Sequence, residues 1–223
     1  TGVLTPVAEL EPIPLGGVVI KRATLHNFDE IKRLSIKIGD TVLIERSGDV
    51  IPKIVKVIND EKNIEKKDFI IPSKCPVCGT EIVKLDDEVA YRCPNNISCK
   101  AQILRSLELF VSKKGLNIEG LGEAIIQQLI DKNFINNIFD IFKIKKFQLL
   151  ELEFFADKKA ENIIFEIEKS KNVDLKNFIY GLGIRHVGEK ASRILAKNYK
   201  TLNDIFEADI EELKIIENFG NVI

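Results

Sequence analysis

Short runs rich in β-branched residues, separated by glycine turns, characterise residues 1–72. Val18–Leu25 has the composition of a strand, Gly39–Arg46 opens with a Gly-Asp turn and continues as a second strand, and Val50–Ile58 alternates in part. Asp29–Leu34 is predicted to form a short helix. Several short strands joined by glycine turns predict a small antiparallel β-barrel, or else a sandwich, in this segment.

Residues 108–223 have the period of amphipathic helices, and a four-residue pattern recurs along them. The repeat is anchored on Gly122, Ala156, Gly188 and Gly220, at spacings of 34, 32 and 32 residues. Seven residues after each of the first three anchors stands an aliphatic side chain, namely Leu129, Ile163 and Leu195. The register predicts an all-α domain of helix–hairpin–helix motifs, with a fourth copy that stops three residues after Gly220.

A glycine turn at the start of a helix has a definite chemical use. Glycine permits close approach of another backbone, and the N–H groups of the first helical turn have no partner within the helix. Together with the helix dipole these groups favour an anion such as a DNA phosphate, which fixes position but carries no base information. The candidate phosphate contacts are Gly120, Gly122, His186, Gly188 and Gly220.

The alternative interpretation of these turns is a set of glycine caps between packed helices, without any ligand. A single turn would favour that interpretation, whereas three glycine-bearing turns in register favour DNA-backbone contacts. Ala156 makes the second copy an exception. We expect its side chain to obstruct the turn, which would leave the second hairpin as a scaffold.

All four cysteines lie in residues 73–107. Cys75 and Cys78 form a Cys-x-x-Cys pair, fourteen residues separate this pair from Cys93, and five more precede Cys99. The stretch between the pairs has the pattern of a hairpin. Two cysteine pairs around a short hairpin predict a zinc finger with four thiolate ligands. Four protein ligands close the coordination sphere, so the metal would be structural rather than catalytic.

Two other uses of the cysteines remain open from the sequence. Two disulfides would require an oxidising compartment, and the cysteines are clustered rather than spread as staples. A redox-active Cys-x-x-Cys would require a βαβ setting, which the pattern around Cys75 and Cys78 does not have. Both are therefore less favoured than zinc.

Composition narrows the class of protein further. With 33 Lys and Arg against 34 Asp and Glu, the formal net charge is -1, which excludes a polybasic tail or a histone-like DNA wrapper. Apolar runs are too short to cross a bilayer, so we expect no membrane partner. Methionine is absent, so we expect the chain to be part of a longer translation product.

No catalytic constellation emerges from the sequence. It has neither a G-x-x-x-x-G-K-[ST] phosphate loop nor the Lys-x-Asp-Gly that marks a nucleotidyl-transfer lysine, and no Ser/His/Asp set can be assembled. His26 is expected to serve packing or a turn. Arg46, ahead of the turn at Ser47–Asp49, is a candidate phosphate contact, or else a solvated strand end.

The whole chain resembles the C-terminal half of the bacterial NAD-dependent DNA ligases. The order of the three segments carries the resemblance, together with the spacing of the cysteines and several short motifs. These motifs are the opening run Thr1–Ala8, Ala23–Asn27, Arg46–Pro52, and Leu182–Arg185 ahead of Val187–Glu189.

The resemblance implies three domains: an oligonucleotide-binding (OB) fold at 1–72, a zinc finger with four cysteine ligands at 73–107, and a helix–hairpin–helix DNA-binding domain at 108–223. It implies a partner, nicked double-stranded DNA, contacted by Thr1, Arg46, Val50 and Ile51 in the minor groove and by the hairpins on the backbone. It also implies a monomer in the bacterial cytoplasm, associated with the nucleoid.

In that family, a lysine in an upstream domain is adenylated by NAD in the presence of Mg or Mn. The AMP then passes to the 5′-phosphate at the nick, and the 3′-hydroxyl displaces it. Such a lysine motif is missing from these 223 residues, so we expect the chain alone to be unable to seal nicks.

Two other classes of protein fit the same features. A non-catalytic module of a repair or recombination protein could combine a zinc finger with helix–hairpin–helix turns. An RNA-binding zinc ribbon protein is the other class. A Lys-x-Asp-Gly motif upstream of Thr1 in the parent gene would favour the ligase, and a recombinase or nuclease domain there would favour the repair module. Equal affinity for nicked DNA and A-form RNA would favour the RNA-binding class, whereas the ligase interpretation requires a preference for B-like duplex, with affinity falling steeply as salt rises.

Overall fold

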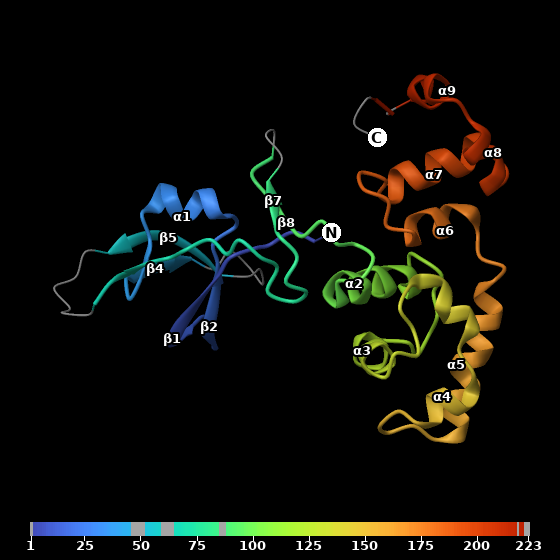
Figure 1. The fold of residues 1–223 in the computed structure, drawn as a ribbon, viewed down its shortest axis with the longest axis horizontal. Coiled ribbons are helices and arrows are strands. Elements are labelled where there is room, and N and C mark those ends of the chain that lie inside the picture. Colours follow the sequence, from blue (N-terminus) through green and yellow to red (C-terminus); the bar gives the residue numbers. More distant parts are fainter. Residues whose placement is uncertain (1, 46–51, 59–64, 85–87, 218, 221–223) are drawn as a thin grey trace. The chain divides into compact units, whose positions relative to one another are not determined.

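The computed structural model describes residues 2–45, 52–58, 65–84, 88–217 and 219–220. The chain folds into two compact units, Gly2–Asn95 and Asn96–Ile223, which we call the N-terminal unit and the helical unit (Figure 1). Each unit is described by itself. None of the helices in the described ranges combines the length and the apolar character needed to cross a bilayer.

The N-terminal unit is built on an open four-stranded sheet in the order β1-β2-β5-β4. Its strands are β1 (Val7–Leu15), β2 (Val18–Thr24), β4 (Thr41–Glu45) and β5 (Lys53–Ile58). β1 pairs with β2 and β4 with β5 in antiparallel fashion, whereas β2 meets β5 in parallel at Thr24 and Lys53. A separate two-stranded sheet joins β3 (Lys37–Ile38) to β6 (Lys67–Asp68).

Helix α1 (Phe28–Leu34) covers the core of this unit. Asn27 caps its N-terminus by accepting the N–H of Glu30 at 2.8 Å. Phe28 and Ile31, three residues apart, lie on one face and are buried against Ala23 and neighbouring apolar residues. The strand predicted at Val18–Leu25 and the helix predicted at Asp29–Leu34 are thus confirmed within one or two residues.

The hairpin of β7 (Val83–Lys84) and β8 (Tyr91–Arg92) packs on this core. The N–H of Leu4 donates to the carbonyl of Tyr91 at 2.9 Å, and that of Cys93 to the carbonyl of Gly2 at 2.8 Å. The Tyr91 ring meets the Phe28 ring edge-on, with centroids 5.1 Å apart. The hairpin that precedes Cys93 is therefore held by the core of the N-terminal unit.

The helical unit is a succession of packed helix pairs, α2 with α3, α4 with α5 and α6 with α7. Its elements are α2 (Lys100–Val111), α3 (Glu123–Asp131), the 3-10 helix η1 (Ile138–Lys143), α4 (Lys146–Leu150), α5 (Asp157–Ser170), α6 (Leu175–Gly181), α7 (Glu189–Asn198), α8 (Leu202–Glu207) and α9 (Ile210–Ile215). Leu129, Ile163 and Leu195, the aliphatic positions of the repeat, are all buried. The predicted register therefore places one side chain per copy in the core.

Candidate metal centre and nucleic-acid interface

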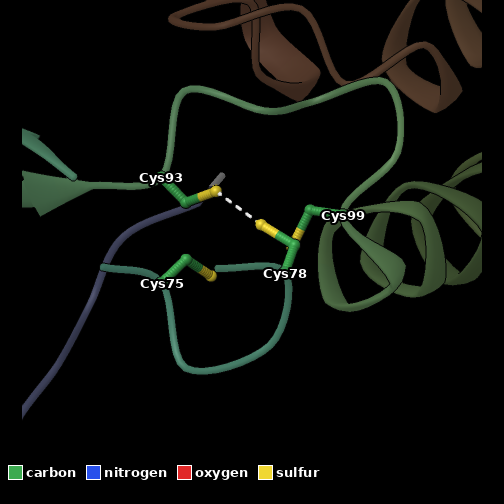
Figure 2. Close-up of side chains that lie close together, drawn as sticks. All are labelled: Cys75, Cys78, Cys93 and Cys99. Atoms are coloured by element: carbon green, nitrogen blue, oxygen red, sulfur yellow. Dashed lines mark hydrogen bonds between the residues drawn. The ribbon is translucent and has the colours of Figure 1, made fainter. Parts of the chain in front are cut away.

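The four cysteine sulfurs converge on one point. Each Sγ of Cys75, Cys78, Cys93 and Cys99 lies within 4.8 Å of the others, and Figure 2 shows the side chains turned toward one another. Cys78 Sγ and Cys93 Sγ are 3.5 Å apart, the interaction drawn as a dashed line. All four are free cysteines, which contradicts the two-disulfide alternative.

Local backbone hydrogen bonds shape this cluster. The N–H of Gly79 donates to the carbonyl of Cys75 at 2.9 Å, and the N–H of Cys75 donates to the carbonyl of Thr80 at 2.8 Å, which closes a tight knuckle. Gly79 has φ +72°, a conformation that glycine adopts without strain. Cys99 caps α2, and the N–H groups of Gln102 and Ile103 both donate to its carbonyl. Helix α2 therefore fixes the last of the four thiols.

The thiols differ in acidity because their surroundings differ. Hydrogen bonding to the side chain and backbone of Thr80 stabilises the thiolate and lowers the pKa of Cys78 to about 6. Burial raises the pKa of Cys93 to about 12. A divalent cation would override this difference, because coordination deprotonates a thiol outright.

The donor set matches zinc in number and kind. Four thiolates about 2.3 Å from one tetrahedral zinc ion would be about 3.8 Å from one another, so the observed cluster needs little rearrangement. Three of the four cysteines are buried, and all four positions would be filled by protein ligands. Such a centre has no open coordination position for a substrate.

The three complete hairpins of the helical unit share one backbone pattern. The last residue before each helix is its N-cap, in extended conformation: Gly122 before α3, Ala156 before α5 and Gly188 before α7. Two residues before each N-cap stands a residue in the left-handed region, with φ +82° at Gly120, +61° at Phe154 and +66° at His186. The turn thus requires positive φ at its first position and not at the N-cap.

This pattern corrects our expectation for the second hairpin. Ala156 has φ −125° and ψ 163°, close to the extended conformations of Gly122 and Gly188. Since an alanine adopts these angles freely, its side chain does not distort the backbone of the turn. The second hairpin therefore has the same form as the other two. That the second hairpin serves only as a scaffold stays a prediction.

Glycine at the N-cap is not required by the protein's own packing. A Cβ built on Gly122, Gly188 or Gly220 would meet no atom within 4 Å, whereas one built on Gly120 would approach Ile163 to 3.3 Å. The N-caps Gly122 and Gly188, and likewise Gly220, therefore face open space. Glycine there leaves room for a group from outside to approach the first helical N–H groups.

Comparison with known proteins agrees with this architecture. Residues 1–67 match the NAD-dependent DNA ligase OB-fold domain, and residues 74–101 match the NAD-dependent DNA ligase C4 zinc finger domain. The chain carries two domains of the NAD-dependent DNA ligases. Residues 177–223, from α6 onward, match the helix-hairpin-helix motif. The resemblance, the fold class and the zinc-finger assignment made from the sequence are thus confirmed.

Curated proteins named DNA ligase align along nearly the whole chain. DNA ligases of Bacillus mycoides (strain KBAB4) and of Bacillus cereus (strains B4264 and G9842) are each 46% identical over 220 residues. The aligned region covers 99% of this chain and 33% of each relative. The chain spans about a third of the length of the curated relatives it matches.

The predicted DNA contacts fall into two groups. Gly120 and Gly122 lie in the turn before α3, and His186 and Gly188 lie in the turn before α7, where the side chain of His186 is exposed. Gly220 follows α9. Thr1, Arg46, Val50 and Ile51 lie outside the described residues.

The three hairpins also contain charged residues that sequence reasoning did not identify. Each helix begins with an acid at its first position, Glu123 in α3, Asp157 in α5 and Glu189 in α7. Each acid faces a base from an earlier segment: Arg105 at 3.9 Å, Lys146 at 2.8 Å and Lys114 at 2.6 Å, respectively. Lys114 lowers the pKa of Glu189, mainly through their hydrogen bond. The partner bases therefore offset negative charge at the helix N-termini.

Proposed function

We propose that this chain is the DNA-binding portion of an NAD-dependent DNA ligase that seals nicks in duplex DNA during replication and repair. The observation that carries the proposal is the presence of the family's OB-fold and C4 zinc-finger domains, in that order, followed by hairpins whose N-caps face open space. The complete enzyme would join 3′-hydroxyl and 5′-phosphate ends through an adenylated intermediate.

The residues that carry out adenylation would not be among these 223. The sequence contains no Lys-x-Asp-Gly, so the lysine that reacts with NAD, and the sites for NAD and Mg or Mn, would lie elsewhere in the complete ligase. The 223-residue chain alone would bind nicked duplex without sealing it. Detection of ligated product with the purified chain would contradict this.

The chain would consist of three modules: an OB fold at 1–72, a zinc finger at 73–107 and a helix–hairpin–helix domain at 108–223. Cys75, Cys78, Cys93 and Cys99 would hold one structural zinc ion, which stabilises a segment too small to fold on its own core. The zinc finger would connect the other two modules. We propose that the chain acts as a monomer in the bacterial cytoplasm, on nucleoid DNA.

The DNA contacts would be independent of base sequence. Gly120, Gly122, His186, Gly188 and Gly220 would place backbone N–H groups and one imidazole against phosphates, which suits a chain of net charge -1. Thr1, Arg46, Val50 and Ile51 would contact the minor groove at the nick, where an apolar pair can sense groove shape.

Binding of nicked duplex by the whole chain tests this function. Fluorescence anisotropy should show affinity for nicked DNA above that for intact duplex and A-form RNA, and a steep fall with salt. Gly188→Ala should lower the affinity without lowering the thermal midpoint, because φ −85° suits alanine and the new methyl group meets no protein atom. The reciprocal variant, Ala156→Gly, should raise the affinity. Equal affinity for RNA would favour the RNA-binding alternative.

A further inference from the structure

Phe154 is an unusual residue for its place in the second hairpin. Its backbone has φ +61°, and its side chain is 93% exposed. The equivalent positions hold Gly120 and His186. A bulky side chain is uncommon in the left-handed region, and residues in such conformations concentrate at binding sites. Neither burial nor backbone preference explains a phenylalanine at this position.

Two cations accompany the exposed ring. Lys158 and Lys159 follow the N-cap of α5, and neither forms an ion pair with a carboxylate within the part of the chain that the structure describes. The ammonium group of Lys159 lies 4.1 Å from the centre of the Phe155 ring, which holds it near the tip of the hairpin. Asp157 is offset by Lys146 at 2.8 Å. The tip therefore combines an exposed apolar ring with two lysines that form no ion pair in the described residues, and the exposed acids Glu151 and Glu153 precede them. The two ammonium groups are the part of the tip that can contact phosphates.

The second hairpin also presents a different surface to a phosphate. The methyl group of Ala156 stands where Gly122 and Gly188 leave open space, so a phosphate cannot approach the first N–H groups of α5 as closely. Figure 1 shows the loop before α5 and the loop before α7 extending on the same side of the helical unit in this view. A duplex on that side would meet side chains at the second hairpin and backbone at the third.

We propose that the second hairpin binds duplex DNA through side chains: the Phe154 ring packs against sugars and base edges in the minor groove, and Lys158 and Lys159 contact the flanking phosphates. This proposal rests on the proposed DNA-binding function. It adds Phe154, which is not one of the anchor positions of the repeat. Aromatic and apolar wedges are a common device of minor-groove binding.

Because Phe154 has a left-handed backbone, substituting it separates the effect on stability from the effect on DNA binding. Phe154→Gly removes the ring and relieves the left-handed strain, so it should raise the urea midpoint of the chain while weakening nicked-duplex binding roughly tenfold. Phe154→Asn should act in the same direction, because asparagine also tolerates this conformation. Phe154→Tyr keeps an aromatic face and should retain affinity.

The matched control is Phe165→Ala, which removes an exposed ring (66% exposed) from the same helix α5, away from the hairpin. It should leave the affinity unchanged. Unaltered affinity in Phe154→Gly, with wild-type binding intact, would overturn the inference and leave the proposed function standing. A wild-type chain that binds no duplex would overturn both. Self-association of the wild type that Phe154→Gly abolishes would assign the ring to a protein contact instead.

Discussion

The Nζ atom of Lys114, in the loop before α3, lies 2.6 Å from Oε2 of Glu189, the first residue of α7. The two residues are 75 positions apart in the sequence. The contact therefore joins the first hairpin to the third within the helical unit. It also sets the charge at the N-cap that we propose to receive a phosphate.

Lys114→Ala should weaken binding of nicked duplex. Without the ammonium group, the Glu189 carboxylate keeps only Arg193 as a partner, at 3.1 Å, so more of its negative charge is exposed beside the α7 N-terminus and repels the phosphate. We expect the slope of log affinity against log salt to fall by about 1. Anisotropy titrations at several salt concentrations measure this slope.

Adding Glu189→Gln to Lys114→Ala should recover part of the lost affinity, because it removes the repelling charge. Lys171→Ala is the control, since Lys171 forms an ion pair of similar length, 2.7 Å, with Glu168 at the far end of α5. An equal loss in Lys171→Ala would mean that only overall charge matters.

The cysteine cluster should contain about one zinc ion per chain by elemental assay. Thiol titration should find no reactive cysteine until a chelator is added, and four afterwards. Cys99→Ser should lose most of the metal and lower the thermal midpoint, because binding and folding of this segment are coupled. Restoration of the chelated wild type by zinc, but not by magnesium, is the control. A metal-free, disulfide-bonded native chain would contradict the assignment.

Asp140 should contribute stability that depends on pH. Burial alone would raise the pKa of this carboxyl, but the N–H of Asn136 and the ammonium of Lys143 outweigh it and hold the pKa below its ordinary 3.8. A lowered pKa means that the contribution is complete above the ordinary value and is lost as pH falls through the folded-state value. Asp140→Asn should reduce the free energy of unfolding by about 1 kcal/mol at neutral pH.

Urea denaturation of wild type and Asp140→Asn from neutral to acid pH checks this, and the difference should shrink at the acid end. Asp131→Asn is the control, because its side chain is 57% exposed. A difference that stays constant with pH would mean that Asp140 acts through packing alone.

Gly115 should tolerate no side chain. A Cβ at this position would collide with the carbonyl oxygen of Phe110 and lie 2.6 Å from that of Leu109, both of them backbone atoms. Gly115→Ala should therefore lower the free energy of unfolding by about 2 kcal/mol. Gly122→Ala, where a methyl group meets no atom within 4 Å, should change it little. Equal stability of the two variants in urea would contradict the close approach at Gly115.

The spacing of residues in the sequence was sufficient to predict the cysteine cluster and the helical repeat. Cysteines at short, defined separations have few ways to converge other than around a metal, and the four sulfurs do converge. Leu129, Ile163 and Leu195 were predicted to share one helical position, and all three are buried. Local spacing is enough to predict both features, although the N-terminal core and helix α2 hold the cysteines in place.

The interpretation of the second hairpin could not be made from sequence. The glycine register led us to expect that a side chain at Ala156 disturbs the turn, but the N-caps are extended and the left-handed residue stands two positions earlier, at Phe154 in this hairpin. A phenylalanine gives no sequence signal for the left-handed conformation, so the sequence alone does not show which residue of this turn adopts it.

By itself, the sequence determined the order of the segments, the cysteine ligands and the helical register, because each follows from contacts between residues near in the chain. Only the tertiary structure decided the pairing of Lys114 with Glu189, the open space at Gly122 and Gly188, and the exposure of Phe154. These depend on which distant segments pack together, and packing is a property of the folded chain that no local pattern encodes.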